Sequence, residues 1–196
     1  MKRVTVSFVT SNTHKVEEAK YVLRNYPLEV KHLNAKRLEI QAETVEEIAK
    51  YSALQAARDY KASIFVEDTG LFIDALNGFP GPYASYVYTT TDKNGILKLL
   101  EGVTYRKAVF RSAVAFCDIA EKVSCFTGEC IGNISSETRG DYGFGFDPIF
   151  KPLNGAGKTF AEMRLDEKSA ISHRFYALRK FADWYVKSIN VLTTKT

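Results

Sequence analysis

The sequence has 196 residues, 45% of them hydrophobic and 26% charged, with a formal net charge of +4. This balance is ordinary for a globular protein and excludes a disordered, collagen-like or coiled-coil chain. No stretch approaches the ~18 uninterrupted apolar residues of a membrane-spanning helix, and the charges are scattered without the basic runs of nucleic-acid-binding tails. We therefore expect neither a membrane partner nor a nucleic-acid partner.

The first part of the chain alternates strand and helix patterns. Strands are predicted at 3–10, 28–33 and 64–66, and helices at about 14–25 and 45–60. The basic start of the chain alternates apolar and polar residues, which is typical of a strand and not of a signal peptide. Thr44 and Glu47 have the spacing of a capping box at the start of the second helix. The third strand is expected to stop where Glu67 begins.

The second part is richer in loops and β patterns. We expect a loop at 77–83, a short helix capped by Asp92 and ended by Gly102, a hairpin of 106–118 with 122–134, a glycine-rich loop at 140–147, and a helix at about 172–188. The three cysteines fall in the hairpin and form no CxxC pair, which favours reduced thiols in the cytoplasm. This order of elements predicts an α/β fold in which helices flank a twisted mixed sheet.

The segment TSNTHK at 10–15 lies between a predicted strand and a predicted helix. A strand-to-helix turn exposes backbone N–H groups at the positive end of the helix dipole, where a phosphate binds readily. Lys15 would add a cation. The alternative interpretation is that Asn12 or Thr13 only caps the helix and that Lys15 is solvated.

Two adjacent carboxylates, Glu67 and Asp68, follow an apolar run. Burial of such a pair is costly unless a cation compensates it. Mg²⁺ prefers carboxylate oxygens together with phosphate and water, so a further acid is expected from elsewhere, with Glu39 and Glu43 as candidates. The alternative is a solvated or lysine-paired turn.

Phe144 and Phe146 are separated by one glycine in a glycine-rich loop. Their rings would offer a flat surface on which a nucleobase can stack. Core packing around a glycine turn is the alternative.

His173 and Arg174 follow Ser172, a good helix N-cap, at a position where the helix dipole disfavours cations. Their donors suit the O6 and N7 acceptors of a purine edge. The alternative is that they pair with the nearby acids Asp166 and Glu167.

The segment GAGKT at 155–159 resembles the end of a P-loop. The P-loop pattern requires a glycine where this chain has Pro152, and no long apolar helix follows, so a P-loop is not expected. Two other functions remain as alternatives: a P-loop kinase that depends on Lys158, and a nucleotide- or nucleic-acid-binding module without catalysis.

Six segments taken together resemble the inosine triphosphate pyrophosphatase family: TSNTHK at 10–15, EDTGL at 67–71, GFPGPY at 78–83, GFGFDP at 143–148, KTFAEM at 158–163 and EKSAISHR at 167–174. They occur in the family's order and span nearly the whole chain. The resemblance implies a single domain over 1–196 with an elongated, two-lobed α/β fold, an active-site cleft between the lobes, and a homodimer. It also implies Mg²⁺-assisted hydrolysis of deaminated purine nucleoside triphosphates such as ITP, dITP and XTP to the monophosphate and pyrophosphate in the cytoplasm, with Mn²⁺ as a possible substitute.

The same resemblance implies residue roles. Asp68 would accept a proton from water, with Lys15 and Glu67 as further catalytic residues, and Glu39 and Asp68 would hold the metal. The implied substrate-binding residues are Thr10, Ser11, Asn12, Thr13, His14 and Lys15 on the triphosphate, then Thr69, then Phe144, Gly145, Phe146 and Asp147 in the base-binding loop, and Lys168, His173 and Arg174 at the base edge. One departure is Gln55, where many relatives carry a lysine that reaches the phosphates.

Overall fold

The computed structural model describes residues 3–35, 38 and 40–193, with only the backbone described for 190–193. Its elements in chain order are β1 (Val4–Val9), α1 (Thr13–Leu23), β2 (Leu28–Leu33), α2 (Val45–Tyr60), β3 (Ile64–Ile73), β4 (Pro80–Gly81), α3 (Ala84–Leu99), β5 (Lys107–Cys117), β6 (Val123–Ile134), β7 (Phe150–Pro152), α4 (Leu165–Ile171) and α5 (His173–Thr193). Short 3₁₀ turns occur at Asp74–Leu76, Asp147–Ile149 and Phe160–Glu162.

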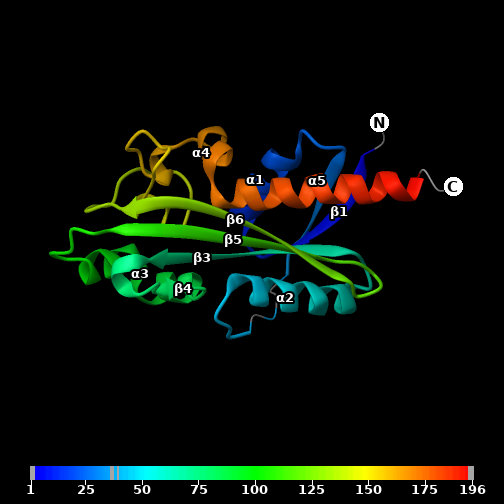
Figure 1. The fold of residues 1–196 in the computed structure, drawn as a ribbon, viewed down its shortest axis with the longest axis horizontal. Coiled ribbons are helices and arrows are strands. Elements are labelled where there is room, and N and C mark those ends of the chain that lie inside the picture. Colours follow the sequence, from blue (N-terminus) through cyan, green and yellow to red (C-terminus); the bar gives the residue numbers. More distant parts are fainter. Residues whose placement is uncertain (1–2, 36–37, 39, 194–196) are drawn as a thin grey trace.

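All strands join one mixed sheet in the order β2-β1-β3-β5-β6-β7, and β4 pairs with β3 outside this path. The strand β1 is parallel to β2 and β3, while the remaining pairings are antiparallel. The long strands β3, β5 and β6 run along the molecule, with α1 and α5 on one side and α2 and α3 on the other (Figure 1). The predicted α/β fold with a mixed sheet flanked by helices is therefore confirmed.

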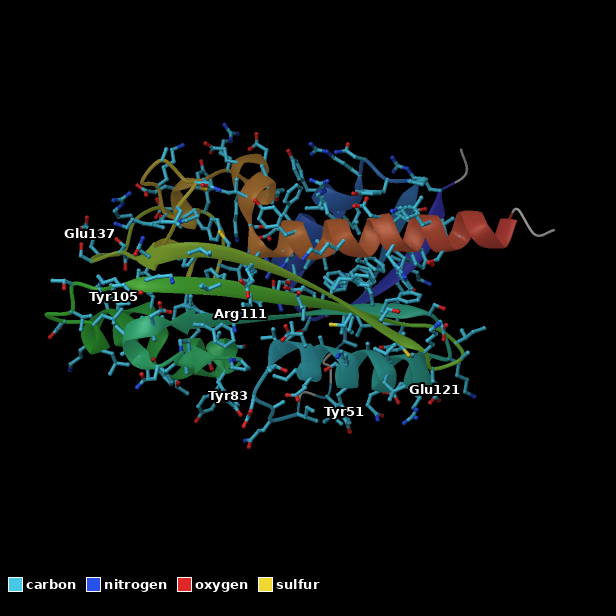
Figure 2. The ribbon with its side chains drawn as sticks, in the orientation of Figure 1. Tyr51, Tyr83, Tyr105, Arg111, Glu121 and Glu137 are labelled. Carbon is cyan, nitrogen blue, oxygen red and sulfur yellow. The ribbon has the colours of Figure 1, made fainter. Side chains whose placement is uncertain are left out.

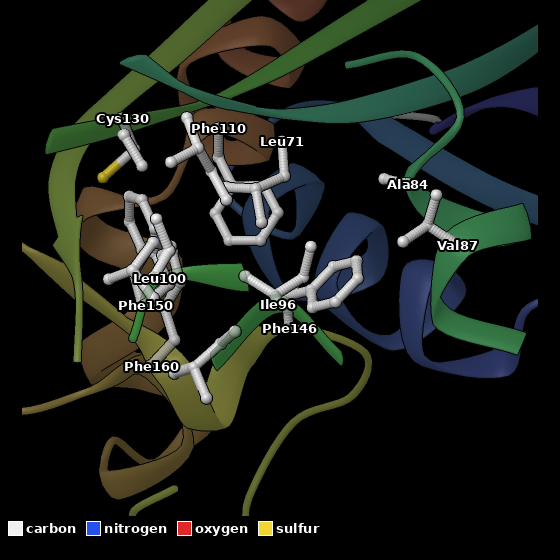
Figure 3. Packing of buried hydrophobic residues seen from close by; sticks show 14 of the residues in the cluster. Leu71, Ala84, Val87, Ile96, Leu100, Phe110, Cys130, Phe146, Phe150 and Phe160 are labelled. Carbon is white, nitrogen blue, oxygen red and sulfur yellow. The ribbon is translucent and has the colours of Figure 1, made fainter. Parts of the chain in front are cut away.

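The hydrophobic core has three clusters. At one end of the sheet a separate cluster packs on each face, and at the other end a third cluster packs against the sheet. Along β3, Phe65 packs with the residues under α1 and α5, while Ile64 and Val66 point to the opposite face and pack under α2. This period-two alternation is what a strand buried on both faces produces. The third cluster lies at the other end of the sheet, where Phe110, Phe150 and Phe160 pack with residues of β3 and α3 (Figure 3).

The prediction that the third strand stops at Glu67 is wrong. The strand β3 continues to Ile73, and β5 pairs with it over its whole length. Both acids therefore lie inside this strand, where Glu67 is fully buried and Asp68 is 7% exposed. Glu67 is tolerated inside the strand because Lys15 and Arg174, which come from distant segments, compensate its charge, and no local pattern reveals this.

Four further elements differ from the sequence expectations. The helix α3 begins at Ala84, well before Asp92, which interrupts it with a backbone φ of 56° and ψ of −176°. The strands β4 and β7 and the helix α4 were not expected. The hairpin of β5 with β6 is confirmed, and Ser172 caps α5 as predicted, because its hydroxyl accepts a hydrogen bond from the Phe175 N–H at 3.1 Å.

Within the part of the chain that the structure covers, no helix is both long enough and apolar enough to cross a membrane.

Candidate active site

The site begins at a gap along one edge of β3. The strand β1 pairs with β3 only at Ile64 and Phe65, and β4 pairs with it only at Leu71 and Phe72. Over the described residues 66–70 this edge of β3 has no strand partner, and the Lys15 ammonium donates to the Glu67 carbonyl at 3.2 Å. Ligands of α/β folds commonly bind at such a discontinuity beyond the carboxyl end of a strand.

A cleft of about 1390 Å³ opens at this gap. Its size exceeds the ~300–1,000 Å³ of most small-molecule pockets. The start of α1, the middle of β3, the first half of α3, the loop 143–147 (hereafter the base loop) and the start of α5 all contribute to its walls: Thr10, Ser11, Asn12, Lys15, Asp68, Thr69, Tyr83, Ser85, Tyr86, Tyr88, Phe110, Phe144, Gly145, Phe146, Asp147, His173 and Arg174 are among the lining residues. Figure 2 shows Tyr83, at the start of α3, on the same side of the sheet as Tyr51 of α2.

The N-terminus of α1 opens into this cleft. Asn12 caps the helix, because its side-chain oxygen accepts from the Lys15 N–H at 3.3 Å, and the Asn12 N–H donates to the Thr10 hydroxyl at 3.1 Å. No acidic residue occupies the first turn, so the positive end of the helix dipole is not neutralised locally. The capping interpretation of Asn12 is confirmed, but the Lys15 side chain is only 12% exposed and is not simply solvated.

Lys15 is held by Glu67, beneath the cleft. Its ammonium lies 2.9 Å from Glu67 Oε2, and the Arg174 guanidinium lies 3.1 Å from Glu67 Oε1. The hydroxyls of Ser112, at 2.6 Å, and Thr69 also donate to Glu67 Oε1. Burial raises the pKa of Glu67, but Arg174 and Lys15 outweigh burial and hold that pKa well below its ordinary value. Glu67 is therefore a buried anion that positions two cations.

The ion pairs continue as a chain toward the base loop. Arg174 Nη1 donates to Glu18 at 2.6 Å, and the Lys168 ammonium donates to Glu18 at 2.8 Å and to Asp147 at 2.6 Å. Burial raises the pKa of Glu18, but Arg174 and Lys168 lower it to about 2. Burial likewise raises the pKa of Asp147, with Lys168 opposing it. Cations and carboxylates thus alternate from Lys15 to Asp147, and these ion pairs join the α1 side of the cleft to the loop 143–147.

Asp68 lines the cleft directly beside this chain. Among the described residues, no group of three or more His, Cys, Asp or Glu side chains could hold a metal ion, and Glu39, the other predicted metal ligand, lies outside those residues. Mg²⁺ is usually bound by one or two protein carboxylates together with substrate phosphates and water. A carboxylate on the cleft wall near the N-terminus of α1 fits that kind of site.

The base loop has one ring in the cleft and one in the core. Phe146 is 3% exposed and packs edge-on against Tyr88 at a centroid distance of 5.4 Å, although it also borders the cleft. Phe144 is half-buried, and its N–H donates to Asp147 Oδ2 at 2.8 Å. A Cβ on Gly143 would lie 2.1 Å from that same oxygen, and Gly143 has a φ of +73°, so this turn requires glycine. The core-packing alternative is confirmed for Phe146.

His173 presents an unsatisfied polar ring to the cleft. It is 2% exposed and stacks on Phe110 at 4.6 Å, and neither ring nitrogen has a hydrogen-bond partner among the described residues. Burial and the nearby Arg174 hold the pKa of His173 well below its ordinary value, so the ring is neutral. A buried polar group without a partner is costly, so this ring points to a polar group on a ligand.

The alternative pairing of Arg174 with Asp166 or Glu167 is wrong, because Arg174 pairs with Glu18 and Glu67. Glu167 instead pairs with Lys158 at 2.9 Å. The P-loop-like segment is a turn outside the cleft, and Thr159 forms a capping box with Glu162.

Several predicted site residues do not form the cleft wall. These are Thr13, His14, Glu67 and Lys168, and the half-buried Gln55 of α2 also lies outside it. Glu18 and Ser112 were missed. Glu18 follows Lys15 by three residues and adjoins the buried Ala19 on α1, so an acid within an apolar helix stripe was the available signal.

Fold and site together define an α/β protein whose mixed sheet is flanked by helices and whose large cleft has the N-terminus of α1 on one side and a buried chain of alternating charges beneath it. The model of the Ham1 family matches residues 6–184. A dITP/XTP pyrophosphatase of Methanopyrus kandleri is 48% identical over 184 residues, which are 94% of this chain and 97% of the relative, and that of Thermococcus kodakarensis is also 48% identical, covering 94% and 98%. The solved HAM1 protein of Coxiella burnetii is 28% identical, covers 94% of this chain and 99% of its own, and has a TM-score of 0.82. The chain belongs to the Ham1 family, which confirms the resemblance seen in the six segments.

Proposed function

We propose that this protein hydrolyses deaminated purine nucleoside triphosphates, such as ITP, dITP and XTP, to the nucleoside monophosphate and pyrophosphate. The names of the relatives, dITP/XTP pyrophosphatases over nearly the full length of both chains, support this function. The observation that carries it is the arrangement of the cleft: Asp68 lies beside the capped start of α1, and His173 with Arg174 lies in the same cleft.

The triphosphate is proposed to lie at the start of α1. The positive end of the α1 dipole would attract phosphate oxygens, and the hydroxyls of Thr10 and Ser11 would donate to them. An ammonium has three donors, and Glu67 engages Lys15 through its carboxylate and its carbonyl. Glu67 would hold the Lys15 ammonium in place, and its remaining N–H donor would point to the phosphates.

Water would attack the α-phosphorus, the bond to the pyrophosphate oxygen would break, and Asp68 would take the proton of that water. Mg²⁺, held by Asp68 together with the proposed Glu39, would neutralise charge on the phosphoryl oxygens when bound. Lys15 would offset the negative charge that develops as pyrophosphate leaves.

Base choice is proposed to depend on donors at the start of α5. Hypoxanthine and xanthine have a 6-oxo acceptor, which suits the Arg174 guanidinium and an N–H of neutral His173. Adenine has a 6-amino donor there and would leave these groups unpaired. A site built to hydrogen-bond one such group can reject an analogue that lacks it by up to about 10⁴–10⁵.

A panel of nucleoside triphosphates tests the function. With Mg²⁺ present, pyrophosphate release from ITP and XTP is expected to exceed release from ATP by at least about 100-fold in kcat/KM, because adenine leaves buried donors unsatisfied. The products are quantified by chromatography and a pyrophosphate assay. Release of orthophosphate in place of pyrophosphate, or equal rates with ATP, would refute this specificity.

Metal removal tests the proposed cation. Chelation with EDTA is expected to abolish turnover of ITP, and excess Mg²⁺ is expected to restore it, with Mn²⁺ as a possible substitute. Lys15 and Arg174, which line the cleft, are already paired with Glu67, so neutralising the triphosphate charge requires a further cation. Turnover that persists unchanged after dialysis against the chelator would contradict the metal requirement.

The other parts of the proposal are a homodimer, a cytoplasmic location and a single domain with two lobes. The continuous strands β3, β5 and β6, which serve the cores of both lobes, support the single domain.

A further inference from the structure

One predicted triphosphate residue, His14, does not line the cleft. Asn12 and Lys15 of the first turn of α1 line the cleft, whereas the His14 side chain is 54% exposed and lies over the base loop. Its ring is parallel to that of Phe144 within 11°, at a centroid distance of 5.3 Å. His14 also lies 3.8 Å from Glu17. Its contacts therefore join the start of α1 to the base loop.

Asp147 holds the backbone of the base loop, because its carboxylate accepts the Phe144 N–H at 2.8 Å, but this hydrogen bond does not fix the orientation of the Phe144 ring. Gly143 and Gly145 on either side have positive φ angles of 73° and 61°. A Cβ on Gly145 would meet no atom within 4 Å, so the loop has open space on that side. The ring must therefore be positioned by what it touches.

The Phe144 ring has two kinds of neighbour. Lys168 Nζ lies 4.8 Å and Arg174 Cζ 5.4 Å from its centroid. Both cations are fixed, because each is buried and paired with Glu18. The His14 ring is the exposed neighbour, and it sits on the helix whose first turn borders the proposed triphosphate site. Stacking on His14 thus sets the ring plane of Phe144 relative to that helix.

We infer that His14 is a positioning residue for base binding, which acts through Phe144 and does not touch the reacting phosphates. The inference rests on the proposed function. Aromatic stacking of this kind favours one ring orientation, and the loss of it leaves the glycine-flanked ring free to rotate away. The nucleobase would then lack a correctly oriented Phe144 ring on which to stack.

The test is a set of matched variants assayed with ITP. His14→Ala is expected to raise KM by roughly three- to tenfold with kcat little changed, since an aromatic pair contributes modestly to binding and not to the chemical step. His14→Phe, which keeps a flat ring, is expected to restore KM. Glu17→Gln removes the other contact of His14 and is expected to leave KM unchanged. Thermal unfolding of each variant confirms that the fold is intact.

A spectroscopic measurement provides a readout that does not depend on turnover. In the unliganded protein, the ring protons of His14 are expected to show an upfield ring-current shift in NMR spectra that disappears in Phe144→Leu. An unchanged His14 shift in that variant would overturn the inference, as would a His14→Ala variant with wild-type KM or one with a fall in kcat alone. If the unmodified protein released no pyrophosphate from ITP or XTP, the proposed function itself would fail, and the NMR result would still report on the stacking.

Discussion

Asp68→Asn is expected to reduce pyrophosphate release from ITP by at least about 100-fold, the lower end of what a positioned general base contributes. The amide keeps the size of the side chain but neither accepts a proton at neutral pH nor supplies an anionic oxygen to a metal. Steady-state assays of pyrophosphate release measure the loss. Calorimetric titration with ITP is expected to show that nucleotide binding remains measurable, because the start of α1 and the His173–Arg174 pair are unaltered.

Asp74→Asn is the matched control for this variant. Asp74 follows β3 on the same chain segment, but its side chain is 38% exposed and interacts with Lys107 at 3.5 Å and with the Tyr105 hydroxyl at 3.0 Å, away from the cleft. Its substitution is expected to leave turnover near the wild-type rate. Full activity of Asp68→Asn, or an equal loss in Asp74→Asn, would remove Asp68 from the catalytic step.

Glu18→Gln is expected to destabilise the fold by about 3–5 kcal/mol at neutral pH, because two buried cations, Arg174 and Lys168, each lose one of their two carboxylate partners. Glu18 is 4% exposed and joins Arg174 to Lys168. For a chain of this size, such a loss corresponds to a fall in Tm of roughly 6–20 °C. Chemical denaturation measures the free energy of unfolding. Glu17→Gln, on the exposed side of the same helix turn, is the control and is expected to change stability by at most about 1 kcal/mol.

The contribution of Glu18 to the free energy of unfolding is expected to depend on pH. The pKa of Glu18 is about 2 in the fold against an ordinary value of 4.5. A lowered pKa stabilises the fold at pH values above the ordinary value, and the contribution is lost as the pH falls through the folded-state value. The shift corresponds to about 3 kcal/mol. The difference between the wild type and Glu18→Gln is therefore expected to narrow as the pH falls from 4.5 toward 2, and a difference that stays constant over this range would refute the ion-pair account.

Local chemistry made several features of the site predictable. The strand followed by TSNTHK predicted a capped helix end with a lysine, because capping depends on residues three positions apart, and the structure has Asn12 as the cap with Lys15 lining the cleft. The pairing of β5 with β6 was equally local, since a short turn joins them. The six segments in order also predicted the family, which the comparisons confirm.

The charge network was beyond sequence reasoning. Glu67 looked like the end of a strand because an acid after an apolar run usually marks a solvated turn, yet it lies fully buried within β3. Burial of a carboxylate is tolerated only where cations compensate it, and its partners come from α1 and α5. Arg174 and Glu18 are 156 residues apart in the chain, so no spacing rule joins them.

The sequence by itself determined the order of the main helices and strands, the mixed α/β fold, the family, and the kinds of side chain that the cleft would need. Only the tertiary structure decided which cation meets which carboxylate, that Glu67 and Glu18 lie beneath the cleft, and that His14 packs on Phe144. The physical reason is range: capping and strand alternation act between residues a few positions apart, whereas buried ion pairs and ring stacking form between whichever segments the packing of helices on the sheet brings together.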